Sequence, residues 1–212
     1  MSKAAPRAES TQTLVVGGGL AGLYAAWQMH QAGMECLLLE AAPRLGGRIL
    51  SQPIAPGSPL GVDLGPMWFW PHQRRMQSLC RELGIRTFEQ PSAGDVLYQQ
   101  AAGRAPQRHS GAGAVPSWRI EGGVQTLVTA LAARLDAGQI RLEHKVESVV
   151  RNADRWCLTA SCKGNNHQFA APRLVFAAPP RQLAPLITSQ PWLPPQLHQA
   201  LLATPTWMAA QA

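Results

Sequence analysis

The chain has 212 residues, is 46% hydrophobic and carries a formal net charge of +7, which indicates a globular α/β domain with room for a small second lobe and excludes a disordered chain. Charged residues make up only 15%, a low share for a free-standing soluble domain. The basic residues are scattered, so we expect the positive charge to serve a solvated surface or an anionic small ligand, and not a nucleic acid.

The amino terminus and the cysteines together indicate a cytoplasmic protein. Met1–Gln12 lacks the apolar core of a signal peptide, and we expect residues 1–10 to form a disordered tail. The apolar run Leu14–Trp27 contains four glycines and is too short to span a bilayer, so no membrane contact is expected. A reducing compartment and no metal site are predicted, because no Cys-x-x-Cys or Cys/His pair has ligand spacing among Cys36, Cys80, Cys157 and Cys162.

The first elements along the chain form one strand–helix–strand unit. Thr13–Val16 is a short β-rich apolar run that ends in glycines, which is typical of a buried parallel strand. Leu20–Gln31 reads as a helix that ends at Gly33, and Cys36–Leu39 is a second buried strand. This order predicts a Rossmann-type βαβ unit, which binds dinucleotides.

Three glycines between the first strand and the helix have the spacing G-x-G-x-x-G. Gly17 permits a tight turn, Gly19 lets the backbone approach a pyrophosphate, and Gly22 lets the helix pack on the strand. The helix then begins at Leu20 and Ala21, whose backbone N–H groups point at the phosphates. The pattern predicts the pyrophosphate site of a dinucleotide.

A carboxylate and a basic loop follow the second strand. Glu40 stands where an acidic residue accepts hydrogen bonds from the adenosine ribose, and its charge disfavours the 2′-phosphate of NADP. After Ala41, Arg44 and Arg48 flank a Gly-Gly pair that ends at Gly47; guanidinium groups suit a diphosphate, and the glycines let the backbone pass close to a ligand. An NAD dehydrogenase does not need this second loop, so the pattern favours FAD.

After Glu40 the sequence predicts loops, helices and mainly antiparallel strands. Ala41–Pro71 is rich in glycine and proline and reads as a loop, and Ser110–Pro116 reads as a flexible connector. From Pro179 onward the chain is rich in proline. The predicted elements are a helix at Arg74–Leu83, a hairpin at Val96–His109, a helix at Val124–Leu135, a strand at Ile140–Leu142, antiparallel strands at Val146–Arg151, Trp156–Ser161 and His167–Ala170, a buried strand at Leu174–Ala178 and the start of a helix at Leu197–Leu202.

The segment E-A-x-x-R-x-G-G-R, which begins at Glu40 and follows the glycine motif, resembles the flavin amine oxidase family. Val62–Gly65 with Trp68 resembles the family's segment near the flavin ring, and Glu121–Gly123 resembles the Gly-Gly segment that opens the next helix. The resemblance extends over Leu142–Val149 and Leu174–Pro180 and implies FAD as cofactor, with contacts from Leu64, Gly65, Pro66, Met67 and the backbone of Val146.

The family resemblance implies a chemistry as well as a cofactor. The flavin would remove a hydride equivalent from a C–N or C–C bond of a small molecule such as an amine. Pro66 departs from the family pattern, where a glycine is usual, and it supplies no backbone N–H. Family members run about twice as far as this chain, which stops at Ala212, so we expect an N-terminal portion that is inactive alone and associates through the surface left by the absent half.

The predicted fold class is α/β: a Rossmann-type FAD/NAD(P)-binding domain with a parallel sheet and a β-meander, plus part of a second, substrate lobe. The FAD-binding domain takes residues 11–72 and 119–183, and the partial substrate domain takes 73–118 and 184–212. No catalytic residue is assigned. An NAD-dependent dehydrogenase and a non-catalytic FAD-binding fragment are the alternatives.

Five residues in or near the flavin-ring segment are candidates for a chemical role. We expect Asp63 to be a hydrogen-bonding structural carboxylate rather than a catalytic base, and His72 to be a loop residue. For the aromatic segment Trp68–Trp70, core packing is favoured over a pocket-lining role.

Overall fold

The computed structural model describes residues 8–58, 61–110, 115–187, 190 and 192–205. The chain divides into two compact units, of which the first comprises Met1–Leu50 and Val128–Ala212 and the second Ser51–Leu127. These units divide the chain at other places than the predicted FAD-binding and substrate domains, and that functional division stays a prediction.

The first unit contains the predicted parallel sheet. Strand β2 (Thr13–Val16) leads through helix α1 (Leu20–Gln31) to β3 (Cys36–Leu39), and the sheet has the order β10-β3-β2-β14. All neighbouring pairs are parallel, with β10 (Ile140–Arg141) and β14 (Arg173–Phe176) at the two edges. The predicted βαβ unit is therefore confirmed, and the carboxyl ends of β2, β3 and β14 lie side by side.

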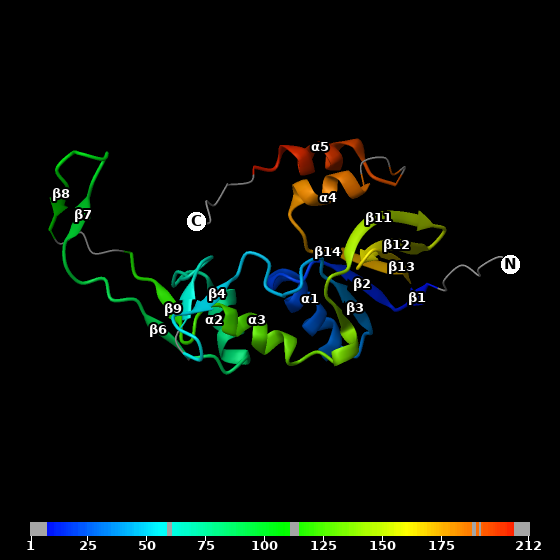
Figure 1. Ribbon diagram of the computed structural model, residues 1–212, viewed down its shortest axis with the longest axis horizontal. Helices are drawn as coiled ribbons and strands as arrows, with labels where there is room; N and C mark the ends of the chain where they lie inside the picture. The colour runs from blue at the N-terminus through cyan, green and yellow to red at the C-terminus, as the bar shows by residue number, and fades with distance from the viewer. Residues whose placement is uncertain (1–7, 59–60, 111–114, 188–189, 191, 206–212) are drawn as a thin grey trace. The chain divides into compact units, whose positions relative to one another are not determined.

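Both central strands are buried along their whole length, which is typical of strands covered on two faces. Helix α1 contacts β2 and β3 with a face that buries Leu23, Ala26 and Trp27. The side chains of Leu14 and Val16 belong to a core cluster shared with an antiparallel sheet. Since side chains alternate along a strand, α1 and that sheet cover opposite faces (Figure 1).

The second sheet of this unit is the predicted β-meander, formed by β11 (Lys145–Asn152), β12 (Arg155–Cys162) and β13 (Asn165–Ala171). A short strand, β1 (Glu9–Ser10), pairs with β13, so the prediction of a disordered tail is wrong for these two residues. The edge of β13 offers unpaired N–H and C=O groups, which a neighbouring extended segment satisfies. The rest of the expected tail, residues 1–7, lies outside the described residues.

Two helices follow the parallel sheet in the first unit. Helix α5 (Pro195–Ala203) contains the predicted Leu197–Leu202, whereas α4 (Pro180–Ile187) was not predicted. Proline at the first helical position costs nothing, because its N–H would be unpaired there. The internal Pro185 is tolerated where Leu183, Ala184 and Ile187 are buried.

The second unit is built from short elements. Helix α2 (Arg74–Glu82) and the hairpin of β7 (Val96–Tyr98) and β8 (Gln107–His109) confirm the predictions for those segments, and α3 (Gln125–Ala132) begins here as expected. Four strands of three residues were missed, of which the first two lie in the segment predicted to be a loop; they are β4 (Ser51–Pro53), β5 (Gly61–Asp63), β6 (Thr87–Glu89) and β9 (Trp118–Ile120). Of the predicted connector, residues 111–114 lie outside the described residues.

The aromatic segment of the second unit corrects one expectation. Phe69 is buried, with 4% of its surface exposed, and its backbone pairs with Trp118. Trp68 and Trp70 are 46% and 39% exposed, so the prediction that each packs in the core is wrong for both. Sequence alone did not separate them, because all three have the same apolar character.

Burial sets the chemistry of the cysteines, all four of which are free thiols. It raises the pKa of the Cys36 and Cys80 thiols, since a thiolate loses hydration there. Iodoacetamide at about pH 8 should therefore label Cys157 and Cys162 at least about tenfold faster than these two in the folded protein. Peptide mass spectrometry after timed quenching measures the rates, and equal labelling of all four cysteines would contradict the burial pattern.

Every helix in the described part of the chain is too short or too polar to cross a membrane.

Candidate functional site

The glycine motif lies at the carboxyl end of β2, between the two flanking strands. The N–H of Gly17 donates to the carbonyl of Leu39 at 2.9 Å, and the N–H of Ala177 donates to that of Val16 at 2.8 Å. Gly17 has a φ of +111°, and a Cβ on it would lie 2.7 Å from the Ala177 carbonyl oxygen. The predicted tight turn is present, and it requires glycine.

The other two glycines of the motif differ in what surrounds them. A Cβ on Gly22 would lie 1.9 Å from the carbonyl oxygen of Gly17, so close packing of α1 on the turn requires glycine. A Cβ on Gly19 would find its nearest protein atom, the Gly46 carbonyl oxygen, 4.0 Å away. Protein packing therefore explains Gly22 but not Gly19, which agrees with the prediction that Gly19 leaves space for a ligand.

The amino terminus of α1 is open to an anion. Its N-cap is Gly19, which makes no side-chain hydrogen bond, and the first turn contains no acidic residue. Leu20 is half-buried and Ala21 is exposed. The first backbone N–H groups of a helix lack intrahelical partners and carry a partial positive charge, so this end offers donors to a diphosphate.

Glu40 ties the end of β3 to the glycine turn. One carboxylate oxygen accepts the backbone N–H of Gly18 at 2.6 Å, and the other accepts that of Ala42 at 2.7 Å. The side chain is half-buried, and each carboxylate oxygen has a second lone pair free for a ribose hydroxyl. The sequence predicted only the ribose role; the bond to Gly18 joins residues 22 positions apart and depends on the fold.

The start of β11 lies beside Glu40. The backbone N–H of Glu40 donates to the backbone carbonyl of Arg141 at 2.9 Å, and the N–H of His144 donates to the Glu40 carbonyl at 2.8 Å. Val146 follows two residues later, buried and paired with Ala160. Val146 thus lies two residues after His144, whose backbone contacts Glu40. The contact of Val146 with adenine stays a prediction.

Arg44 has a structural role that the sequence did not predict. Its guanidinium donates to the carbonyls of Leu45 at 3.2 Å, Ile49 at 3.0 Å and Gly47 at 2.9 Å. The side chain therefore stabilises the conformation of the loop at residues 44–49. A diphosphate contact by Arg44 stays a prediction and would have to use its remaining donors.

The basic loop also lies against the glycine turn. The N–H of Gly46 donates to the carbonyl of Gly18 at 2.8 Å. A Cβ on Gly47, whose φ is +57°, would lie 3.4 Å from the Gly19 Cα. Ala41 and Arg48 are exposed. The loop thus brings the backbone of Gly46 and Gly47 against the glycine turn at the open end of α1, and a diphosphate contact by Arg48 stays a prediction.

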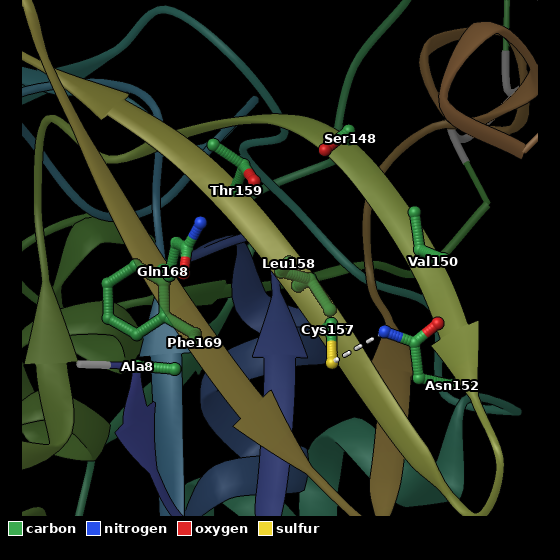
Figure 2. A pocket seen from close by; sticks show the side chains of 9 residues that line it. All are labelled: Ala8, Ser148, Val150, Asn152, Cys157, Leu158, Thr159, Gln168 and Phe169. Carbon is green, nitrogen blue, oxygen red and sulfur yellow. Dashed lines mark hydrogen bonds between the residues drawn. The ribbon is translucent and has the colours of Figure 1, made fainter. Parts of the chain in front are cut away.

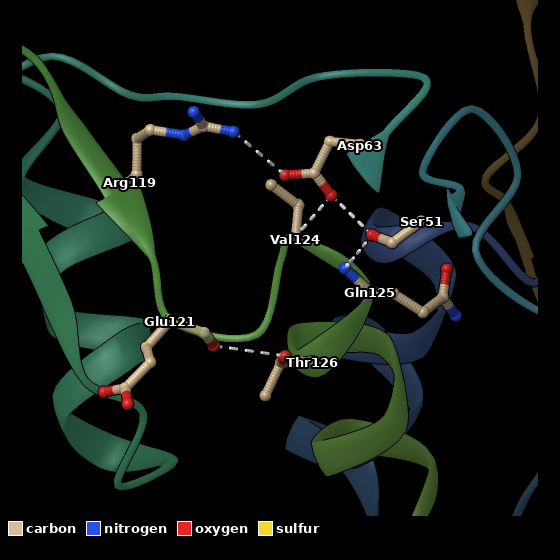
Figure 3. A network of polar contacts seen from close by, with 7 residues as sticks. All are labelled: Ser51, Asp63, Arg119, Glu121, Val124, Gln125 and Thr126. Carbon is tan, nitrogen blue, oxygen red and sulfur yellow. Dashed lines mark hydrogen bonds and ion pairs between the residues drawn. The ribbon is translucent and has the colours of Figure 1, made fainter. Parts of the chain in front are cut away.

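In the second unit, Asp63 is the centre of a polar network (Figure 3). Its buried carboxylate accepts the Ser51 hydroxyl and the Val124 N–H, the latter at 2.9 Å, and lies 4.0 Å from the Arg119 guanidinium. Ser51 Oγ accepts the N–H of Gln125 at 3.2 Å. Two strand residues thus cap the amino terminus of α3, which confirms the structural role expected for Asp63.

The Gly-Gly segment before α3 fits this network. Gly122 and Gly123 have φ values of +79° and +86°, and a Cβ on Gly123 would lie 2.9 Å from Asp63 Oδ1. The predicted opening of a helix after this pair is confirmed. Nothing tests the predicted flavin contacts, which stay a prediction; Leu64 and Pro66 are exposed, and Gly65 and Met67 are half-buried.

A pocket of about 260 Å³ lies on the outer face of the meander (Figure 2). None of its lining side chains is charged, and none belongs to the predicted site. It therefore offers no cation for a diphosphate. The lining residues are Ala8, Ser148, Val150, Asn152, Cys157, Leu158, Thr159, Gln168 and Phe169.

Two family models match the sequence. Residues 15–83 match the NAD(P)-binding Rossmann-like domain, and residues 107–207 match the flavin containing amine oxidoreductases. Together they cover both the glycine motif and the meander.

Curated proteins show the same similarity over a shorter segment. A probable flavin-containing monoamine oxidase A of Dictyostelium discoideum is 37% identical over 38% of this chain and 17% of that protein. Amine oxidase [flavin-containing] B of Mus musculus is 38% identical over 37% and 15%, and putrescine oxidase of Kocuria rosea is 35% identical over 40% and 17%. The aligned segment is thus less than a fifth of each relative.

Solved structures extend the similarity to most of the fold. Wild-type putrescine oxidase bound to putrescine matches with a TM-score of 0.78 at 19% identity, over 92% of this chain and 64% of that one. Cyclohexylamine oxidase from Brevibacterium oxydans matches with a TM-score of 0.75 at 16% identity, over 91% and 63%. At these identities the likeness concerns the fold, and the chain spans less than two thirds of either structure.

Proposed function

Because the chain belongs to the flavin-containing amine oxidoreductases, a family whose cofactor is FAD, we propose that its first unit binds the ADP half of FAD. The observation that carries the proposal is the open amino terminus of α1, with no capping side chain and with free space at Gly19. A diphosphate is the ligand that suits such a helix end.

Each part of the ADP group has residues suited to it. The N–H groups of Leu20 and Ala21, with the guanidinium of Arg48, face the diphosphate in this proposal. The free lone pairs of Glu40 accept the ribose hydroxyls, and the backbone of Val146 serves the adenine. The proposed flavin end uses Leu64–Met67, where Pro66 contributes no N–H.

The proposed activity is oxidation of a small amine. Bound flavin supplies the hydride-accepting chemistry at a C–N bond, and the protein binds and orients the cofactor. Support comes from the match of residues 107–207 to the amine oxidoreductases. The alternative of an NAD-dependent dehydrogenase is supported only by the Rossmann-like segment at 15–83, which flavoproteins and NAD enzymes share.

Glu40 should make the site discriminate against a 2′-phosphate. We expect ADP to bind at least about tenfold more tightly than its 2′-phosphorylated analogue, because the carboxylate repels the added charge. Glu40→Gln should weaken ADP binding about 5- to 100-fold, because charge-assisted hydrogen bonds are lost. The same variant should reduce the preference for ADP over its 2′-phosphorylated analogue. Isothermal calorimetry with the full chain measures both constants.

The matched control is Glu35→Gln, an exposed glutamate just before β3. Since Glu40 also holds Gly18 and Ala42, thermal unfolding of each variant separates lost binding from lost folding. An unchanged ratio of the two nucleotide affinities in folded Glu40→Gln would remove the ribose role.

A further inference from the structure

Three potential metal ligands meet at one end of the meander. His144 precedes β11, Cys162 ends β12 and His167 lies near the start of β13, and one ligand atom of each lies within 4.8 Å of the others. In the register, Ala160 pairs with both Val146 and His167. His144 and Cys162 lie two residues beyond that row, so all three side chains project from the same face.

We propose that His144, Cys162 and His167 bind a zinc-like divalent cation. Two imidazoles and a thiolate are a donor set that zinc prefers, with a water in the fourth position. Zinc–ligand bonds of about 2.0–2.3 Å put neighbouring tetrahedral ligand atoms about 3.4–3.7 Å apart. The ligand atoms, which now lie within 4.8 Å of one another, therefore have to approach each other by about one ångström. Side-chain rotation can provide this movement, because His167 is exposed and the other two residues are half-buried.

His144 is already oriented for this role. Its Nδ1 lies 2.7 Å from the carbonyl oxygen of Leu142, which can only accept, so Nδ1 carries the hydrogen and Nε2 keeps its lone pair for a metal. The ring also packs against His167, at 5.1 Å between centroids, and edge-on against Phe169 at 5.9 Å. A backbone partner on the non-ligating nitrogen is the usual support of a metal-bound histidine.

The neighbouring charges do not oppose a cation. Lys163 follows Cys162 directly, but its ammonium lies 3.3 Å from the carboxylate of Glu143, the residue before His144. The nearby Lys145 is likewise paired with Glu147 at 3.2 Å. Each ammonium group is thus balanced by a carboxylate. A bound dication would then add only one net positive charge, because Cys162 loses its proton on binding the metal.

The site was not predictable from spacing. His144 and Cys162 are 18 positions apart and share no short metal motif; only the antiparallel register brings them together. The inference goes beyond the proposed cofactor site and does not depend on it, since none of the three ligands is assigned a contact with the cofactor and all three lie in the first unit.

Cobalt(II) is the probe, because thiolate-bound tetrahedral cobalt absorbs visible light strongly and zinc displaces it. We expect one cobalt per chain, with a sulfur-to-metal charge-transfer band. Cys162→Ser should abolish that band, and His167→Ala should weaken binding at least about tenfold. Cys157→Ser is the control: it lies half-buried on the same strand, at an odd separation and therefore on the opposite face, and should bind like the parent.

Protection from alkylation provides a second readout on the unmodified protein. Zinc should slow iodoacetamide labelling of Cys162 and leave that of Cys157 unchanged. Absence of the charge-transfer band, its persistence in Cys162→Ser, or equal zinc protection of both cysteines would overturn the proposal. FAD affinity is not part of either readout, so the proposed cofactor site can fail without affecting this result.

Discussion

Replacing Gly22 with alanine should destabilise the folded chain by about 3 kcal/mol, because the added methyl group has no space on the turn that it packs against. The new Cβ would lie 1.9 Å from the carbonyl oxygen of Gly17 and 3.2 Å from the Cβ of Ala177. The first of these atoms is backbone and belongs to a turn held on both sides by strand hydrogen bonds. Helix α1 would have to move away from β2, with loss of its buried contacts.

Urea unfolding followed by circular dichroism measures this cost. Gly138→Ala is the matched control, because Gly138 has no atom within 4 Å of its Cβ position and lies in a short helical turn at Ala137–Gln139. That variant should stay within about 0.5 kcal/mol of the parent. Equal unfolding midpoints for the two variants would show that α1 does not pack as tightly on the turn as described.

Asp63→Ala should have the second-largest effect, a loss of about 2–4 kcal/mol of folding free energy. The substitution leaves the N–H of Val124 and the hydroxyl of Ser51 without their buried acceptor. It also removes the partner of Arg119, although that guanidinium is 37% exposed and can be hydrated. Asp63→Asn should cost less, because its amide oxygen can still accept one of these hydrogen bonds.

Hydrogen exchange localises the effect to the start of α3. The amides of Val124 and Gln125 should lose protection in Asp63→Ala before the rest of the second unit. Asp95→Ala, which removes a surface partner of Arg108 in the same unit, is the control and should cost much less. If both variants have the same stability, Asp63 is not the cap of this helix.

The sequence predicted the two central strands of the parallel sheet because they are short apolar runs, and it predicted the meander from three strand-like segments joined by turns. It predicted the turn at Gly17 and the packing role of Gly22, since a strand–glycine–helix order restricts what those positions can do. The short strands β4 and β5 were missed, because they lie in a segment rich in glycine and proline that reads as a loop. Helix α4 was missed because its segment is rich in proline, which rarely occurs inside helices, although one of these prolines stands at a favourable first position.

The site was less predictable than the fold, because its contacts depend on strand register. The second role of Glu40 requires Gly18 to face the end of β3, and the internal role of Arg44 requires its loop to curl back on itself. The cluster around Cys162 depends on three strands in phase. Residue spacing in one dimension carries no information about such cross-strand contacts, whereas motif spacing within a single turn does.

FAD binding by the full chain, compared between the parent and Gly19→Val, tests the central claim most directly. Gly19 has φ −73° and ψ 180°, which valine can adopt, and its Cβ would meet no protein atom closer than 4.0 Å. The variant should keep its thermal stability but bind FAD at least about 100-fold more weakly than the parent, measured by flavin fluorescence quenching, because the side chain fills the space beside the helix end. A parent chain that does not bind FAD, or a folded Gly19→Val variant that binds FAD as tightly as the parent, would contradict the assignment of this loop to the diphosphate.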